Sequence, residues 1–84
     1  MVIPEGVEVI GDDWFSGTSV KKLIISSSVR ELGARAFYEC YELRTVIFAE
    51  NGELKIIGER CFQGTGIESI KIPRTVVSIR DKAF

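Results

Sequence analysis

The chain has 84 residues, 45% of them hydrophobic and 27% charged, which allows one small domain that buries about 60–65% of its unfolded surface and leaves little room for an enclosed active site. Its 11 lysines and arginines against 12 aspartates and glutamates give a net charge of −1, which argues against a dedicated nucleic-acid-binding protein. No apolar run approaches the ~18 residues of a membrane-spanning helix, and the absence of histidine removes the commonest general base and metal ligand.

An internal repeat of about 23 residues runs along the chain. Two columns of residues recur at intervals of 22, 25 and 22, namely Phe15, Phe37, Phe62 and Phe84, and Ile10, Leu32, Ile57 and Ile79. Three further columns recur at intervals of 23 and 24, namely Val20, Leu43 and Ile67; Leu23, Val46 and Ile70; and Ile25, Phe48 and Ile72. Five columns with one period predict a tandem repeat, and therefore a solenoid.

The elements of one unit follow in a fixed order. A strand such as residues 43–48 has the form L-x-x-L-x-L, with Val46 and Phe48 facing inward. A corner and a second extended pair such as Val29…Leu32 come next, followed by a segment such as residues 34–38, which is long enough for one helical turn. The corner at residues 49–53 has a two-residue insertion with an Asn-Gly turn signal, and we expect it to bulge outward.

The repeat resembles that of the BspA-like leucine-rich-repeat family. The pattern Ile-Pro-x-x-Val-x-x-Ile-Gly-x-x-Ala-Phe-x-x-Cys-x-x-Leu-x-x-Ile is matched by residues 3–15 and 29–43, and it restarts at residues 72–79 before Ala83-Phe84. The resemblance implies a repeat solenoid: a right-handed leucine-rich-repeat coil, mainly β, with a parallel concave sheet and short helical turns on the other side. It covers residues 1–84 as a single domain of about three and a half repeats, expected to be a segment of a longer array.

The same resemblance implies a cell-surface or secreted adhesin-like protein. We therefore expect a non-enzymatic protein-interaction module that binds a protein partner, such as a host or extracellular-matrix protein, through the concave β-sheet. The alternative is a structural repeat that self-associates into homo-oligomers by stacking through its open terminal repeats. No catalytic constellation, cofactor or metal site can be assembled from the residue types present, and no nucleic acid or membrane insertion is expected.

The candidate partner-binding residues point outward from three predicted strands of the concave sheet. They are Lys21, Lys22, Ile24, Arg44, Thr45, Ile47, Glu68, Ser69 and Lys71. Four are basic and one is acidic, and Val2 extends the apolar column of Ile24 and Ile47. A charged face with an apolar stripe is typical of a protein-binding patch, although β-branched residues also suit strands for their own sake.

Other candidate sites have plainer explanations. Cys40 and Cys61 fall at different points of neighbouring units, so two buried thiols are favoured over a disulfide or a catalytic thiol. The Gly17-Thr18 and Gly64–Gly66 segments lack the Gly-Lys-Ser/Thr ending of a phosphate loop and are interpreted as turns. The acidic residues of the first unit match no calcium loop and are expected to form a solvated, mutually repelling edge; they are Glu5, Glu8, Asp12 and Asp13.

Trp14 departs from the repeat, because it stands where the other units have Ala36, Cys61 and Ala83. An indole does not fit an alanine site between two layers. It can, however, lie across an open end of the stack as a cap, which is the favoured interpretation; a binding aromatic is the alternative.

Overall fold

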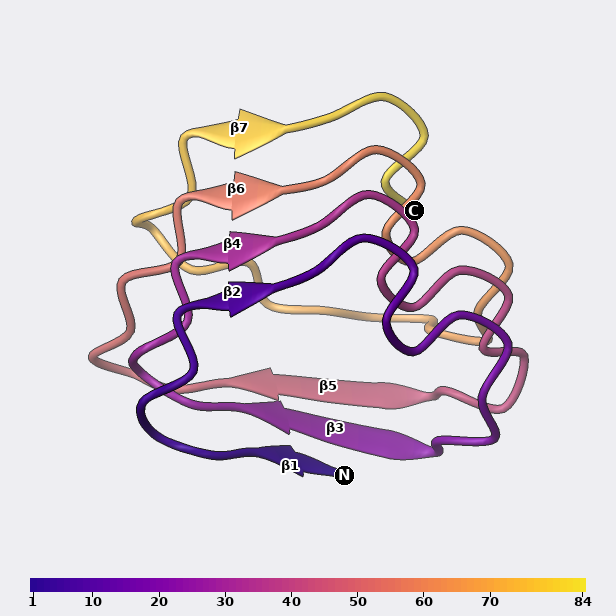
Figure 1. Ribbon diagram of the computed structural model, residues 1–84. Helices are drawn as coiled ribbons and strands as arrows, with labels where there is room; N and C mark the ends of the chain where they lie inside the picture. Colours follow the sequence, from indigo (N-terminus) through magenta and orange to yellow (C-terminus); the bar gives the residue numbers. More distant parts are fainter.

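Seven short parallel strands wind into a β-solenoid of about three turns in the computed structural model, which describes residues 1–84 (Figure 1). The strands are β1 (Val2–Ile3), β2 (Val9–Ile10), β3 (Lys22–Ile25), β4 (Glu31–Leu32), β5 (Thr45–Phe48), β6 (Ile56–Ile57) and β7 (Ser78–Ile79). They form two parallel sheets, of order β1-β3-β5 and β2-β4-β6-β7; successive strands alternate between the sheets as far as β6, and β7 joins β6 in the second sheet. No helix is present, and so none that is long and apolar enough to cross a membrane.

The strand register follows the predicted repeat residue for residue. In the first sheet Ile24 lies opposite both Val2 and Ile47. In the second sheet the predicted aliphatic column is continuous, with Ile10, Leu32, Ile57 and Ile79 side by side. A slip of one residue in any strand would turn its apolar side chains to solvent, so burial holds this register.

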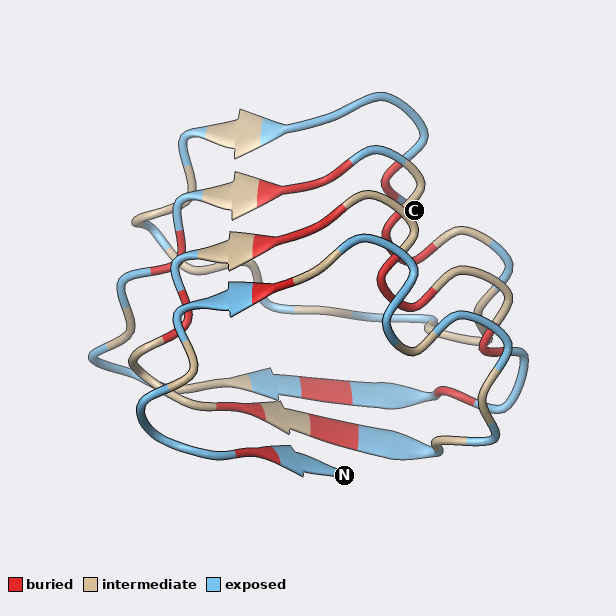
Figure 2. Cartoon of the chain, viewed as in Figure 1, coloured by how far each residue is buried: buried red, intermediate tan, exposed pale blue.

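Buried residues recur from coil to coil in both sheets and in the turns that join them (red in Figure 2). Sixteen hydrophobic residues form one buried cluster, and no polar or charged residue is buried. The phenylalanine column stacks along the solenoid, with ring centroids 5.4, 5.5 and 5.4 Å apart from Phe15 through Phe37 and Phe62 to Phe84. The predicted core columns are therefore confirmed except at their last members, because Ile79 and Phe84 are 50% and 49% exposed.

The predicted short helical turns are absent, and this expectation was wrong. Residues 34–39 form tight turns in which the direction of the amide alternates. The amides of Arg35 and Phe37 donate to Glu59 and Cys61 of the next coil, at 2.8 and 2.9 Å. The amides between them bond within their own coil, three residues back, as Ala36 does to Gly33 at 3.2 Å. An α-helix bonds its amides to the carbonyl four residues earlier, whereas here the internal bonds reach three residues back and the amides between them leave the coil.

One residue in each of these turns has a positive φ, which also interrupts a helix. The value is 61° at Asp13, 56° at Arg35, 56° at Arg60 and 55° at Lys82. These positions are one repeat apart, so all four coils use the same backbone conformation, although none of the four residues is glycine.

The first sheet ends at β5, whereas we expected a fourth strand in residues 67–72. The amide of Gly66 donates to Leu43 O at 3.0 Å, but no main-chain amide of residues 67–72 donates a hydrogen bond. Ile67, Ile70 and Ile72 still pack against the core. The fourth unit is thus in phase with the others but does not complete the ladder.

The glycine column that follows β2, β4 and β6 leaves no room for a side chain between the coils at Gly33 and Gly58. A Cβ added to Gly33 would lie 2.6 Å from Asp12 Oδ1 and 2.7 Å from Ile10 O of the preceding coil. A Cβ on Gly58 would lie 2.6 Å from the carbonyl carbon of Gly33. Only glycine permits this spacing between main chains.

We predict that Gly33→Ala lowers the free energy of unfolding by about 1–3 kcal/mol, because the methyl group meets backbone that cannot move without breaking the Gly33 N–Ile10 O bond. Gly11→Ala is the comparison: the three atoms nearest to an added Cβ there belong to the Trp14 side chain, which can rotate, so we expect the smaller loss that comes from displacing the indole. Urea unfolding followed by far-UV circular dichroism measures both. Equal losses in the two variants would contradict the close-approach argument.

Candidate functional site

The outward side of the β1-β3-β5 sheet brings two predicted columns together. Lys22 lies directly opposite Thr45, and both are exposed. Ile24 is half-buried between Val2 and Ile47, whose side chains are 65% and 44% exposed. The sheet therefore presents a row of apolar side chains beside a lysine, at a spacing fixed by the ladder.

Lys21 and Arg44 immediately precede β3 and β5 in the sequence, and their side chains differ in their contacts. Lys21 is exposed and its side chain forms no hydrogen bond or ion pair. Arg44 is also exposed, but its guanidinium donates to Tyr41 O at 3.2 Å and lies against the main chain of Gly66, in the space that a side chain there would fill. Arg44 is thus held toward the fourth coil, and Lys21 and Lys22 are the cations that project from the face.

The third set of predicted residues lies beyond the edge of the sheet. Glu68, Ser69 and Lys71 are exposed, but they belong to the segment that forms no strand. Their spacing relative to β5 is therefore not fixed by a hydrogen-bonded ladder, as that of the first two sets is.

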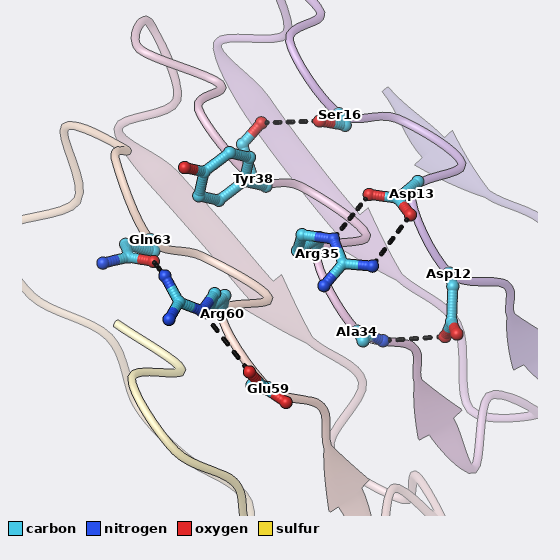
Figure 3. Close-up of polar contacts among 9 residues, drawn as sticks. All are labelled: Asp12, Asp13, Ser16, Ala34, Arg35, Tyr38, Glu59, Arg60 and Gln63. Atoms are coloured by element: carbon cyan, nitrogen blue, oxygen red, sulfur yellow. Dashed lines mark hydrogen bonds and ion pairs between the residues drawn. The ribbon is translucent and has the colours of Figure 1, made fainter.

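No ion pair neutralises the cations of this face. All three ion pairs of the chain lie elsewhere: Arg30 with Glu8 at 2.8 Å, Arg35 with Asp13 at 3.0 Å, and Arg60 with Glu59 at 3.4 Å. The last two lie on the turn side (Figure 3), where Asp13 raises the pKa of Arg35 by its hydrogen bonds and its charge. The predicted face therefore keeps four basic side chains against one acidic one.

The acidic residues of the first coil bind the second coil, so the expected repelling edge was wrong. Asp12 Oδ1 accepts from Ala34 N at 2.9 Å, and Glu5 Oε1 accepts from the amide and hydroxyl of Ser27 at 3.1 and 2.8 Å (Figure 3 shows the first). Asp13 and Glu8 form two of the ion pairs. No three acidic or cysteine residues are placed to hold a metal ion.

Both cysteines are free, buried thiols, as favoured from the sequence. Cys40 Sγ donates to Phe15 O at 3.1 Å. Burial raises the pKa of Cys61 to about 12, so its reactive thiolate form is scarce at neutral pH. Neither thiol is suited to nucleophilic catalysis.

The glycine-threonine segments are turns, as expected. Gly17 and Gly64 have φ of 72° and 80°, and in the longer second unit Glu39 adopts the same conformation. The hydroxyls of Thr18 and Thr65 each donate to the carbonyl three residues earlier, at 2.9 Å.

Trp14 lies over Gly11 at the open end of the first coil. Its indole fills the space over Gly11. Over Gly33 and Gly58 the equivalent space is filled by the main chain of the preceding coil. The ring meets Phe15 edge-on at 6.5 Å and remains 60% exposed. This placement agrees with the cap interpretation, but the cap covers the glycine corner and not the whole apolar layer.

Sequence reasoning missed one feature, a hollow of about 440 Å³ between the 49–52 corner and residues 71–75. The two-residue insertion in this corner was the available signal. It predicted that the chain bulges outward, but not that a space opens beneath it.

The chain has two parallel sheets joined by tight turns, and apolar residues at equivalent positions of successive coils form columns in its core. These features define a leucine-rich-repeat solenoid. The chain belongs to the BspA-type leucine-rich-repeat family: the family described as "BspA type Leucine rich repeat region (6 copies)" matches residues 1–84. The resemblance inferred from the repeat is thereby confirmed.

The fold is also similar to that in the crystal structure of the pneumococcal vaccine antigen PcpA. The TM-score is 0.84 at 22% sequence identity, over 87% of this chain. The similar region spans 18% of the PcpA chain, and no curated protein matches. At this identity the likeness concerns the fold.

We predict a pH dependence of stability from Cys61. Its pKa rises from an ordinary value of 9.0 to about 12 on folding, so the unfolded state loses its proton first. Stability is therefore full below about pH 9 and falls by up to about 1.4 kcal/mol per pH unit as the pH rises toward about 12.

Cys61→Ala is the matched control, because Ala36 and Ala83 occupy the equivalent buried positions. The difference in free energy of unfolding between wild type and this variant should shrink or reverse from about pH 8 to pH 11. A difference that stays constant over this range contradicts the assignment.

Proposed function

We propose that the chain is a non-enzymatic protein-interaction module that binds an acidic protein partner through the outward side of the β1-β3-β5 sheet. The observation that supports it is the pairing of Lys21 and Lys22, which have no carboxylate partner, with the exposed column of Val2, Ile24 and Ile47. Unpaired cations attract an acidic partner at long range, and an apolar row supplies surface that binding removes from water. The family's repeats are generally non-catalytic, in keeping with this proposal.

We further propose that the module works in a cell-surface or secreted adhesin-like protein, with a host or extracellular-matrix protein as its partner. The support is the family membership, together with the similar fold in a protein described as a vaccine antigen, a class of molecule that antibodies must reach. The partner is expected to present carboxylates to the two lysines and an apolar side chain to Ile47.

A second candidate function is self-assembly through the open C-terminal end. Val77 is 79% exposed, Ile79 is 50% exposed on the edge strand β7, and Phe84 stacks on Phe62 with its other side uncovered at 49% exposure. Head-to-tail stacking would bring this end against the first coil, where Trp14 lies over Gly11. The indole opposes that contact, and self-assembly therefore ranks second.

We predict that Lys22→Glu weakens binding to the partner about tenfold at low salt, because it reverses the charge beside the apolar column. Lys82→Glu, an equally exposed reversal on the turn side, is the control and should change binding little. Surface plasmon resonance against immobilised extracellular-matrix proteins, at low and high salt, measures both. Equal losses from the two variants would reject this face as the binding surface.

We predict that the wild type stays monomeric over a wide concentration range in size-exclusion chromatography with light scattering. Trp14→Ala should lower the melting temperature, since it uncovers the Gly11 corner, without weakening partner binding. A wild-type mass that grows with concentration would instead make self-assembly the leading function. Unchanged stability in Trp14→Ala would refute the cap.

A further inference from the structure

The segment of residues 67–75 is bonded to the third coil at both of its ends but not between them. The amides of Gly66 and Val77, just outside the segment, donate to carbonyls of the third coil at 3.0 and 2.9 Å. No main-chain amide within the segment donates a hydrogen bond, and no carbonyl of residues 67–72 accepts one. The three isoleucines of residues 67–72 nevertheless pack against the core. The segment is therefore held where a fourth strand would lie, with its main-chain hydrogen-bonding groups unused.

A proline stands where the last bond of this ladder would form. In the third coil Ala49 N donates to Ile25 O at 3.1 Å. Pro73 holds the position of Ala49 in the fourth coil, and a proline has no N–H to donate. The hollow beside the 49–52 corner lies at this same end of the segment. The ladder from the third coil to the fourth is therefore open where the preceding ladder closes.

The repeat fixes which side chains a closed ladder would bring together. Residues 24 apart correspond in the third and fourth coils, as Val46 and Ile70 do. The outward pairs would then be Arg44 with Glu68, Thr45 with Ser69, and Ile47 with Lys71. The first pair joins opposite charges, which favours closure. The third pair places a cation at the end of the apolar column.

Closure changes what a partner on the sheet face meets. Lys22 and Ile47 are held at a spacing that the ladder fixes, whereas Lys71 is exposed on a segment without a ladder. After closure Lys71 lies beside Ile47, so an acidic partner gains a further cation at a fixed spacing. A ligand shifts an equilibrium between two conformations only by its difference in affinity for them, and the contact with Lys71 supplies that difference.

We propose that residues 67–72 act as a strap that closes onto β5 as a fourth strand when an acidic partner binds the outward side of the β1-β3-β5 sheet. The trigger rests on the proposed function, whereas the open strap is a property of the unbound chain. Pro73 keeps the strap open by withholding one hydrogen bond, and Lys71 couples its closure to the partner. The strap is accordingly the adjustable part of the binding face, and the three strands are its fixed part.

Amide hydrogen exchange of the labelled chain, followed by NMR, tests whether the strap is open. In the unbound chain the amides of Ser69 and Lys71 should exchange at least about tenfold faster than those of Ile24 and Ala49, which are bonded to the preceding coil at 2.9 and 3.1 Å. Pro73→Ala restores the missing donor, so it should slow the exchange of Ser69 and Lys71 several-fold.

Pro4→Ala is the matched control for this substitution. Pro4 holds the same position in the first coil, where an amide has no strand beyond β1 to meet. Both substitutions remove the same restriction from the unfolded chain, so the comparison isolates the restored bond. Pro4→Ala should leave the exchange of Ser69 and Lys71 unchanged.

A defined probe tests the coupling, namely the N-acetylated and C-amidated peptide Glu-Leu-Glu-Leu-Glu, which alternates carboxylates with apolar side chains. At saturation it should shift the amide signals of β3 and β5 and slow the exchange of Ser69 and Lys71 at least about tenfold. The peptide Gln-Leu-Gln-Leu-Gln should do neither. Pro73→Ala should tighten binding of the acidic peptide several-fold, and adding Lys71→Gln to it should remove that gain.

Each outcome separates the strap from the proposed function. Slow exchange of Ser69 and Lys71 in the unbound wild type, or equal effects of Pro73→Ala and Pro4→Ala, overturns the strap and leaves the proposed function untouched. Shifts in β3 and β5 without slower exchange in residues 67–72 also reject the strap, while they support the sheet face as the binding surface. An acidic peptide that shifts no signal of β3 or β5 counts against the proposed function, and it rejects the inference as well because the trigger is lost.

Discussion

Hydrogen bonding between neighbouring coils requires each residue to lie beside its counterpart one repeat away, and most features of this solenoid follow from that requirement. It aligns Ile10, Leu32, Ile57 and Ile79 in one column, and it stacks the phenylalanine rings about 5.4 Å apart. It also makes the turns non-helical, because every second amide there is used to bond the next coil. At Gly33 and Gly58 it brings the main chain of the preceding coil so near that no side chain fits.

The sequence was sufficient to predict whatever depends on this repetition. The core columns, the outward position of Lys22, Ile24, Thr45 and Ile47, and the buried free thiols all follow from phase and periodicity. Burial acts on the column as a whole, so one residue's environment can be inferred from its counterparts. Family membership followed from the same columns.

Features set by one particular contact could not be predicted this way. The carboxylates of Glu5 and Asp12 bond the second coil because amides and a serine happen to face them, whereas charge counting predicted repulsion. Arg44 folds onto Gly66, which has no side chain to exclude it. The fourth strand fails although its apolar residues are in phase, because a ladder needs main-chain alignment as well as burial.

Three features of this solenoid depart from the regularity that the core columns impose. Trp14 lies over Gly11, where Gly33 and Gly58 have the main chain of the preceding coil, and the insertion at residues 49–53 lies beside a hollow lined also by residues 71–75. The exposed lysines beside β3 are a third departure, because no ion pair binds them as the arginines of the turn side are bound. Lys21 and Lys22 at β3, and Lys71 and Arg74 at the hollow, are basic residues without ion pairs. The ladder fixes β3 in the first sheet, whereas the segment before Arg74 is held through the packing of Ile70 and Ile72 against the core. Core burial alone therefore keeps the fourth coil in phase, and the ladder is needed in addition to fix the spacing of its outward side chains.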